Sequence, residues 1–187
     1  MRKRKADSRA RLLEAAEKTT YRYGFGNTAI ADIAREARVP VGNVYYYFKT
    51  KDEIGGAIVN LRVSRFRKLL EEFDQTDSPK QRLCAFVDVK IKNRRELARH
   101  GCPVGTLCSE LRKLGGSAAD RSTLLFSTAL KWMERQFRAL GKGADSRLLA
   151  VHLLSATQGV SVLAHTFSDP GPIDMEAMRL KDWIRSL

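Results

Sequence analysis

The chain has 187 residues, of which 43% are hydrophobic, and it carries a formal net charge of +13. This length and apolar share are ordinary for a globular protein with a sizeable core, and the basic balance favours a polyanionic partner, with nucleic acid the leading candidate. Residues 1–56 hold 12 basic and 7 acidic side chains, so the excess of positive charge extends into the rest of the chain. There, a solvated basic face is a more ordinary explanation than a second contact surface.

The cysteines and the first residues argue against a secreted, disulfide-stapled protein. Three cysteines and no apolar leader predict a reducing cytosol, and hence a cytoplasmic protein without a disulfide framework. The basic stretch of residues 1–5 is either a flexible arm that touches DNA or a disordered tail. Polar residues interrupt the most apolar segment, residues 151–167, so neither a bilayer span nor a membrane partner is expected.

Apolar residues recur at spacings of three and four along the chain, which predicts an all-α protein of about nine helices. The first helix is expected from about Asp7 to Tyr23, where a glycine follows. Thr28 is a candidate N-cap for the second helix, and Thr50 with Glu53 forms a candidate capping box for the fourth. The later helices are expected over residues 51–73, 79–100, 104–114, 118–140 and 145–167, and from the turn at residues 169–172 to the end of the chain.

Residues 28–52 look like two short helices joined by a tight turn and followed by a cluster of tyrosines and a lysine. Such a unit can place its second helix in the major groove of DNA. Three core residues and three outward-facing residues are expected on that second helix, namely Val41, Val44 and Phe48 inside, and Asn43, Tyr46 and Tyr47 outside. The alternative is that the three tyrosines form a packed aromatic cluster that does not contact DNA. Because three consecutive tyrosines on a helix point in three directions, at least one of them has to face water.

This segment resembles the TetR family of one-component transcriptional repressors. The residues that carry the resemblance are Thr28, Ile33, Ala34, Val39, Gly42, Val44, Tyr45, Tyr46, Tyr47, Phe48, Lys51, Asp52 and Ile54. The resemblance covers about the first 55 residues, and the remainder agrees in the number and length of its helices. It implies a helix-turn-helix DNA-binding domain over residues 1–50, with the motif at about residues 31–50, and a ligand-binding and dimerisation domain over residues 51–187.

By position, the resemblance also implies which residues contact a double-stranded DNA operator. They are Thr28, Val41, Gly42, Asn43, Tyr45, Tyr46 and Lys51. Thr28 lies where its hydroxyl and a helix N-terminus meet a phosphate, and the two tyrosines and the lysine match phosphate-contacting positions. The other three residues lie where the recognition helix meets base edges, and the Asn43 amide can pair with adenine.

Two positions of the motif depart from the family pattern. Arg38 stands in the turn where a small residue or glycine is usual, and if that position needs a positive φ, an arginine there costs on the order of 1 kcal/mol. Pro40 and Val41 stand where serine and lysine are frequent. Proline is acceptable in the first turn of a helix, but the missing lysine removes one contact to phosphate or base. The operator preference therefore differs from that of relatives.

Dimerisation is expected, because one helix-turn-helix domain makes few base contacts, whereas two copies related by a two-fold axis reach two half-sites. The last two helices are rich in small and apolar residues and are suited to an intersubunit four-helix bundle. The expected interface residues are Leu153, Ala156, Gly159, Val160, Leu163, Ile173, Leu180, Trp183 and Ile184. The alternative is that these residues form an intramolecular core.

A small-molecule effector pocket is expected in the body, walled by helices four to eight. The candidate residues are Phe66, Phe86, His100, Cys102, Leu107, Cys108, Phe126, Trp132 and Met133. Cys102 and Cys108 lie near a helix start, where a thiol can become reactive, although inert buried cysteines are the more ordinary case. The stretch over residues 101–107 resembles one branch of the family whose effectors are often lipophilic or aromatic. No metal site and no cofactor are expected.

These features together predict a ligand-responsive repressor that binds a palindromic operator as a homodimer and is released by a small lipophilic effector. The alternatives are a thiol-based redox or electrophile-sensing regulator, and a helical ligand-binding protein that does not bind DNA. An enzyme is not expected, because neither a nucleophile–base pair nor a phosphate-binding glycine loop is recognisable. Gly55 and Gly56, early in the fourth helix, are either a hinge for switching or a site of close packing against the first helix.

Overall fold

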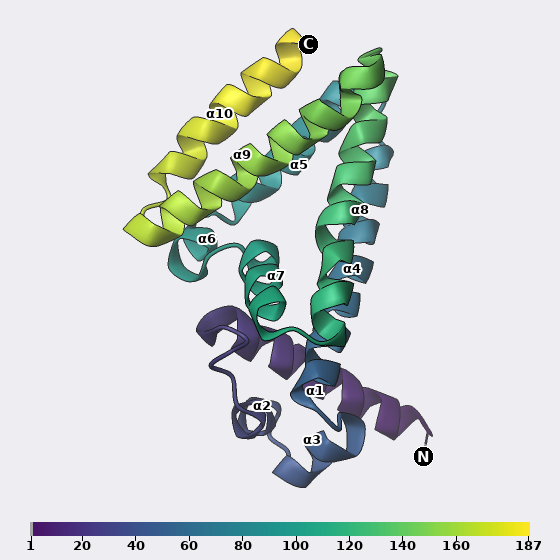
Figure 1. Cartoon of the computed structure of the whole chain (residues 1–187), viewed down its shortest axis with the longest axis vertical. Helices are drawn as coiled ribbons and strands as arrows, with labels where there is room; N and C mark the ends of the chain where they lie inside the picture. Colours follow the sequence, from purple (N-terminus) through teal and green to yellow (C-terminus); the bar gives the residue numbers. More distant parts are fainter. Residues whose placement is uncertain (1) are drawn as a thin grey trace. The chain divides into compact units, whose positions relative to one another are not determined.

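A computed structural model describes residues 2–187, with side chains from residue 8 onward, and it is helical throughout this range without any strand. The all-α prediction is confirmed. Figure 1 shows the ten α-helices. Their bounds are α1 Arg2–Tyr23, α2 Ile30–Ala37, α3 Val41–Tyr47, α4 Lys51–Asp74, α5 Pro79–Lys92, α6 Arg94–His100, α7 Pro103–Leu114, α8 Ser117–Ala139, α9 Ser146–Phe167 and α10 Gly171–Ser186, with a short 3-10 turn at Gly143–Asp145.

The chain packs as two compact units. The first unit contains the residues up to Val63 together with Thr106–Leu125, and the second contains Ser64–Gly105 and Phe126–Leu187. This division follows packing, whereas the boundary expected at residue 50 divides the chain by role, and that division by role stays a prediction.

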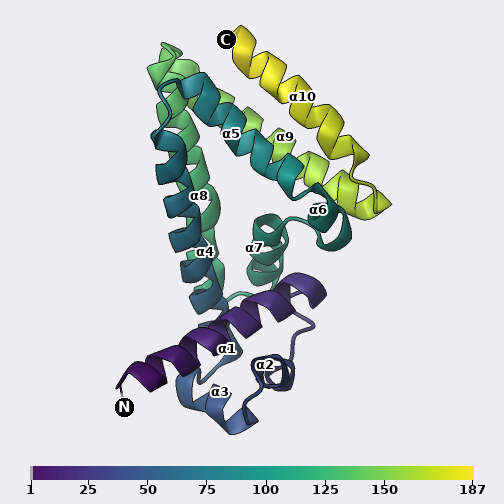
Figure 2. The same cartoon turned by 180° about the vertical axis from the view of Figure 1, so that it is seen from behind.

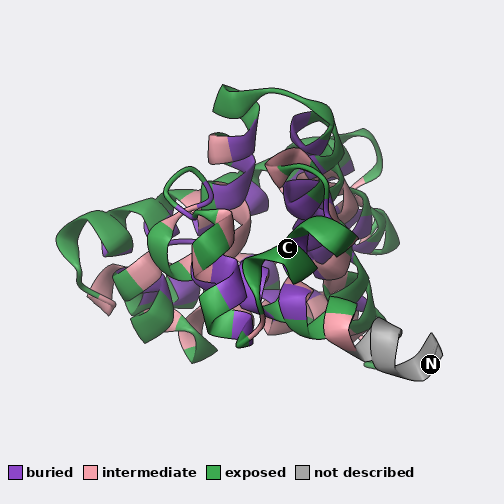
Figure 3. Ribbon diagram, turned by 90° about the horizontal axis from the view of Figure 1, so that it is seen from below, coloured by how far each residue is buried: buried purple, intermediate pink, exposed green. Residues whose placement is uncertain are grey.

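The core of the first unit comes from one face of each of its helices. Leu12 and Ala16 of α1, Ile33 of α2 and Val44 of α3 are at most 2% exposed. α1 packs against α2, and α2 packs against α3. Figure 3 shows the same alternation of buried and exposed faces along the helices. Because α2 and α3, with eight and seven residues, are too short to be stable alone, packing of this shared apolar face holds them in place against α1.

The second unit has an aromatic core. Trp132 and Phe137 of α8 are at most 2% exposed, and the Trp132 ring centroid lies 6.3 Å from that of Phe86 and 6.0 Å from that of Phe73. The buried indole Nε1–H donates a hydrogen bond to the Asp74 carboxylate at 2.9 Å, which satisfies its only polar group. α10 lies along α9 and α5, an arrangement that is visible from behind in Figure 2.

Two predicted helix bounds were wrong. The expected helix over residues 79–100 is divided into α5 and α6 at Asn93, whose ψ of 10° and whose side-chain hydrogen bond to the Val89 carbonyl, at 2.8 Å, interrupt the helix. α1 begins at Arg2 rather than at about Asp7. The predicted contact of a basic arm with DNA concerns Met1 and the side chains of residues 2–5, which lie outside the described part of the chain.

One described helical stretch, residues 143–167, is long and apolar enough to cross a membrane by length and composition alone. The sequence-based expectation that polar interruptions exclude such a stretch was therefore wrong on those two criteria. The core helix of a water-soluble protein passes the same test, and Ala150, Leu153 and Ala164 of α9 are fully buried inside the protein. This stretch is weak evidence for a membrane span.

Candidate nucleic-acid interface

The helix-turn-helix forms as the sequence predicts, with a turn that closes α2 before α3 begins. The backbone N–H of Val39 donates to the Ala34 carbonyl at 3.0 Å, and the N–H of Arg38 donates to the Arg35 carbonyl at 3.1 Å. This pair of bonds is a Schellman motif, which requires a left-handed residue at its corner. Pro40 then supplies the N-cap of α3, where its missing N–H leaves no helical bond unmade.

Arg38 occupies the left-handed corner, with φ 54° and ψ 50°. The sequence raised this possibility, and the structure confirms it. Glycine usually takes this conformation because it has no Cβ, whereas an arginine there costs on the order of 1 kcal/mol. The turn therefore stores a small amount of backbone strain next to the recognition helix.

α3 divides its residues between the core and the surface. Val44 and, just after the helix, Phe48 are at most 2% exposed, whereas Tyr45 and Tyr46 are 49% and 59% exposed. Val41 was predicted both as a core residue and as a base contact. It is 41% exposed, so the core prediction was wrong and only the surface role remains available. The exposed face of α3 comprises Val41, Gly42, Asn43, Tyr45 and Tyr46.

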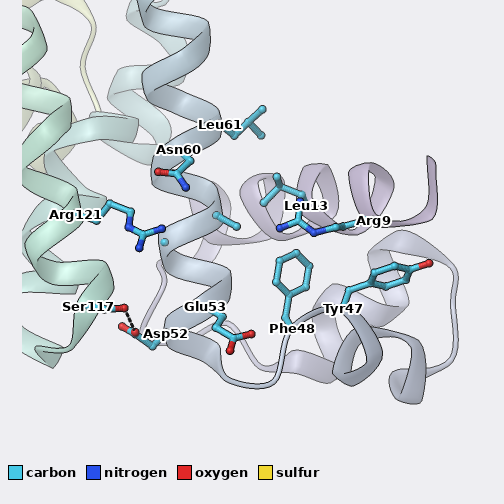
Figure 4. Close-up of a pocket in the computed structure, with 12 residues that line it drawn as sticks. Arg9, Leu13, Tyr47, Phe48, Asp52, Glu53, Asn60, Leu61, Ser117 and Arg121 are labelled. Carbon is cyan, nitrogen blue, oxygen red and sulfur yellow. Dashed lines mark hydrogen bonds between the residues drawn. The ribbon is translucent and has the colours of Figure 1, made fainter. Parts of the chain in front are cut away.

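Tyr47 differs from the two tyrosines before it. It is half-buried, and its ring meets the ring of Tyr46 edge to face at a centroid distance of 4.9 Å. In Figure 4 it lies beside Phe48 at one end of a cleft of about 510 Å³ that α1, α4 and the start of α8 also line. Tyr47 therefore packs against α1 and α4 rather than joining the exposed face of α3, so the expectation that it points outward with Asn43 and Tyr46 was wrong.

Thr28 does not act as the predicted N-cap. Ala29 is the N-cap of α2, and its backbone N–H is held by the Asp32 carboxylate at 3.0 Å. The Thr28 side chain is 2% exposed, and its hydroxyl donates to the Gly24 carbonyl at 2.7 Å. Because that hydroxyl points into the protein and already has a partner, the expected phosphate contact through Thr28 is not supported.

Lys51 begins α4 and lies against the turn between α1 and α2. Its Nζ donates to the Gly26 carbonyl at 2.9 Å and lies 5.1 Å from the centre of the Phe25 ring. An ammonium group has three donors, so the bond to Gly26 orients Lys51 and leaves donors for a phosphate. The Thr50 cap of α4 is confirmed, since its hydroxyl accepts the Glu53 N–H at 3.1 Å. The reciprocal half of the predicted capping box was wrong, because the Glu53 carboxylate accepts the Lys49 N–H at 2.8 Å.

A carboxylate from α7 also holds this turn between α1 and α2. Glu110 Oε2 accepts the Gly26 N–H at 2.9 Å, so Lys51 and Glu110 engage the two sides of one glycine. Glu110 was not predicted, because its partner lies 84 residues away and no local sequence pattern indicates such a contact. The turn that leads into α2 is therefore fixed by residues from two other helices.

Asp52 ties the start of α4 to the start of α8. Its carboxylate accepts the Ser117 hydroxyl at 2.6 Å, drawn as the dashed line in Figure 4, and the Ala118 N–H at 3.0 Å. These hydrogen bonds, that from Ser117 first, hold the pKa of the Asp52 carboxyl below its ordinary value. A helix N-terminus favours such a negative group.

Gly55 is explained by close packing. A Cβ at Gly55 would lie 2.9 Å from the Phe25 ring, 3.1 Å from the Leu111 side chain and 3.2 Å from the Ala118 side chain. A hinge and close packing against the first helix were the two alternatives expected for this position. The structure favours packing, but the neighbours are the turn after α1, α7 and α8 rather than α1 itself.

Most of the residues predicted for the dimer interface lie in the core of a single subunit. Leu153, Val160, Ile173, Leu180 and Ile184 are at most 8% exposed and belong to two buried clusters of the second unit. For these five residues the interface prediction was wrong and the intramolecular alternative holds. Ala156 and Trp183 are half-buried, and only Gly159 and Leu163 are fully on the surface.

A different face of the last two helices is exposed and apolar. This exposed apolar stripe comprises Leu148, Val151, Val162, Leu163 and Phe167 of α9 and Met175 and Met178 of α10, each at least 41% exposed. Gly159 lies in the same stretch of α9, and a Cβ there would meet no atom within 4 Å. A monomer rarely exposes so many large apolar side chains on adjacent helices, and such a patch is typical of an interface.

The predicted effector residues fall into separate groups. Phe86, Trp132 and Met133 belong to the aromatic core of the second unit, with Phe66 and Phe126 packed against it. Cys102 belongs to a second cluster of that unit, and His100 lies near it with its Nε2 3.9 Å from the Glu96 carboxylate. Leu107 and Cys108 belong to the first unit.

The two predicted cysteines have different surroundings. Cys102 is 7% exposed, and its Sγ lies 3.4 Å from the Gly105 N–H in the first turn of α7 and 3.7 Å from Lys90 Nζ. Cys108 is also buried, and its thiol donates to the Ser122 carbonyl at 3.5 Å. Within the described residues, no group of three or more histidine, cysteine or acidic side chains is arranged to hold a metal ion.

Comparisons of the sequence agree with this geometry. Residues 12–58 match the family described as bacterial regulatory proteins, tetR family. An uncharacterized HTH-type transcriptional regulator in the lacX 3' region of Lactococcus lactis is 29% identical over 176 residues, which cover 86% of this chain and 90% of that protein. Transcriptional regulator AcuR of Cereibacter sphaeroides is 29% identical over 77% of this chain and 64% of its own length.

Solved structures share the fold of this chain. A TetR transcriptional regulator from Legionella pneumophila aligns with a TM-score of 0.84 and 20% identity, covering 92% of this chain and 94% of that one. The reduced form of Escherichia coli NemR aligns with a TM-score of 0.78 and 18% identity, covering 94% and 97%. These structures share the helical head and body of the described chain.

Proposed function

We propose that this chain, which belongs to the tetR family of bacterial regulatory proteins and is a DNA-binding regulator rather than an enzyme, represses transcription as a homodimer on a palindromic operator. A small lipophilic effector releases it from the operator. The protein works in the cytoplasm, where both the operator and the effector are accessible to it.

The observation that carries the proposal is the exposed face of α3. Asn43, Tyr45 and Tyr46 stand on the surface of a short helix whose other side is anchored by Val44. Asn43 offers an amide to the edge of an adenine, and the tyrosine hydroxyls and Lys51 reach phosphates on either side. Large aromatic residues with polar hydroxyls, exposed on a short helix, are suited to a nucleic-acid surface.

The exposed apolar stripe supports the dimer. Two copies of α9 and α10 that meet through Val162, Leu163 and Met178 would bury these side chains in an intersubunit four-helix bundle. Gly159 lets the two copies of α9 approach closely, because it presents no side chain. A two-fold axis then sets two recognition helices on two half-sites of a palindrome.

The aromatic core of the second unit supports a lipophilic effector. Phe66, Phe86 and Trp132 form a chain of edge-on and tilted ring contacts at centroid distances of 6.3 Å. Phe66 is only partly buried, so the cluster has an edge at which an apolar molecule would gain contact area. Such a ligand gains affinity from apolar burial rather than from a specific charge.

A second candidate, a thiol-sensing regulator, rests on the surroundings of Cys102. The Gly105 N–H lies 3.4 Å and the Lys90 ammonium nitrogen 3.7 Å from its sulfur, so the thiol has polar neighbours on two sides. This candidate keeps DNA binding and replaces the lipophilic ligand by oxidation or alkylation. Serine substitution of Cys102 and Cys108 separates the two: an unchanged response to the inducer removes the thiol mechanism, and a lost response removes the ligand mechanism.

The direct test of the proposed function is a gel shift on the DNA upstream of the chain's own gene, with and without candidate lipophilic inducers. We expect a shifted complex of two chains with the duplex, and we expect an inducer to dissociate it. A chain that shifts no duplex at low salt contradicts the proposal.

A further inference from the structure

Two non-glycine residues of the described chain adopt the left-handed conformation, and both do so at the same kind of helix end. Arg38, with φ 54°, closes α2, and Ser168, with φ 53°, closes α9. In each case the next residue's N–H reaches back five residues, from Val39 to Ala34 and from Asp169 to Ala164. Glycine would serve either motif without strain.

The head therefore retains an arginine where the backbone favours glycine. Residues held in sparsely populated backbone conformations are frequent at functional sites. Arg38 is exposed, and within the described residues no hydrogen bond or ion pair of its guanidinium is found, so its side chain does not stabilise the fold in a way that explains its presence.

The neighbouring acidic groups are paired with cations other than Arg38. Arg38 lines a groove of about 820 Å³ in which Lys18 pairs with Glu36 and Arg35 pairs with Asp32. The pKa of the Glu36 carboxyl is lowered chiefly by the hydrogen bond from Lys18, with smaller Coulombic contributions that include Arg38. Both acidic groups of the groove are thus already neutralised by other residues.

We propose that Arg38 is a DNA-contacting residue whose guanidinium binds a backbone phosphate beside the recognition helix. It lies three residues before Val41, where α3 begins, so its positive charge stands in the turn that leads into that helix. A guanidinium binds a phosphate in a two-pronged geometry that a lysine lacks. This inference rests on the proposed function, because it names a further residue of the same DNA surface.

The test is Arg38→Gly, measured for both thermal stability and DNA affinity, because the inference predicts effects of opposite sign. Removing the strain raises Tm by about 2 °C. Removing one phosphate contact weakens binding at 0.1 M salt by about eightfold and lowers the salt slope of log K by about 0.9. Both figures are per contact. A dimer loses two such contacts, so its salt slope changes by twice that amount. Affinity is read by fluorescence anisotropy on the upstream duplex.

Ser168→Gly is the matched control, because it relieves the same backbone strain in the second unit. It raises Tm by a similar amount and leaves DNA affinity and salt slope unchanged. Arg38→Lys keeps the charge and the strain, so it retains most of the affinity without a gain in Tm. Arg38→Asn tolerates the left-handed backbone without the charge, and it loses affinity as the glycine variant does.

The outcomes separate the two levels of the proposal. If the unmodified chain binds its duplex and Arg38→Gly binds it with the same affinity and salt slope, the role of Arg38 is wrong and the proposed function stands. If the unmodified chain binds no duplex, the proposed function fails and the role of Arg38 fails with it. A loss of affinity with a higher Tm supports the role.

Discussion

α3 and α9 are both helices with an exposed aromatic or apolar face, yet their sequences are informative to very different degrees. α3 has seven residues and a single buried one, Val44. α9 has 22 residues, apolar on much of its circumference, with a buried face through Leu153 and Ala164 and an exposed face through Val162 and Leu163. The exposed side of α3 was predicted largely correctly, whereas the interface predicted on α9 mixed residues of its buried and exposed faces.

The difference lies in the chemistry of the side chains. A tyrosine or an asparagine on a short helix has few reasons to be there, so residue type and spacing together indicate a surface role. Leucine, valine and alanine serve equally well in a subunit core and in an interface. When apolar residues surround a helix, periodicity shows that it is packed but does not show against which partner.

The largest expected effect comes from placing charges on the exposed apolar stripe. Val162→Asp with Leu163→Asp abolishes the dimer at micromolar concentration and lowers operator affinity at least about a hundredfold, because four large side chains per dimer would no longer be buried. Light scattering during size exclusion measures the mass. Leu114→Asp, at an equally exposed leucine outside the stripe, leaves the dimer intact, and an undisturbed dimer in the double variant would contradict the assignment of this face.

On α3, Asn43→Ala tests base reading. A bidentate amide–adenine pair discriminates by about 1–3 kcal/mol, so the variant binds its operator about tenfold more weakly and loses preference at one base pair of each half-site. Binding to a panel of single-base operator variants measures the change. A variant that is weakened equally on every sequence would instead make Asn43 a backbone contact.

Tyr45→Phe has a smaller effect, which concerns affinity for all sequences rather than preference for one base pair. It removes only a hydroxyl from a side chain that is 49% exposed, and each lost hydrogen bond to a phosphate costs about 1 kcal/mol. The same several-fold weakening is expected on specific and random duplexes, so the specificity ratio stays constant. Tyr47→Phe is the control, since that ring lines the cleft behind α3 and its change should leave affinity unaltered.

The smallest effect concerns stability rather than binding. Asp52→Asn weakens the cap on α8 by about 1 kcal/mol, which lowers Tm by about 2–4 °C at neutral pH. The folded-state pKa of Asp52 lies below the ordinary value of 3.8, so its contribution is present above that pH and is lost as the pH falls through the folded-state pKa. Thermal unfolding from pH 7 to pH 3 should show the two proteins converging, and a constant difference would contradict the capping role.

The same division between local and distant information separates what could be predicted from what could not. The all-α fold, the helix-turn-helix and the left-handed Arg38 follow from patterns within a few residues of one another. Thr28 was misassigned because α2 begins one residue later, with Ala29 as its N-cap, and the Thr28 hydroxyl donates back to the Gly24 carbonyl. Glu110 and the role of Asp52 depend on partners more than sixty residues away, where sequence patterns carry no signal.

The measurement that tests the central claim most directly is a titration of the unmodified chain against its own upstream duplex across a range of salt concentrations. If Lys51 and Arg38 of both copies each bind a phosphate, log K falls with log salt at a slope of about −3.6 or steeper, with two chains bound per site. Absence of binding to any duplex at about 50 mM salt, or binding that does not weaken as salt rises, would contradict a DNA-reading surface on α3.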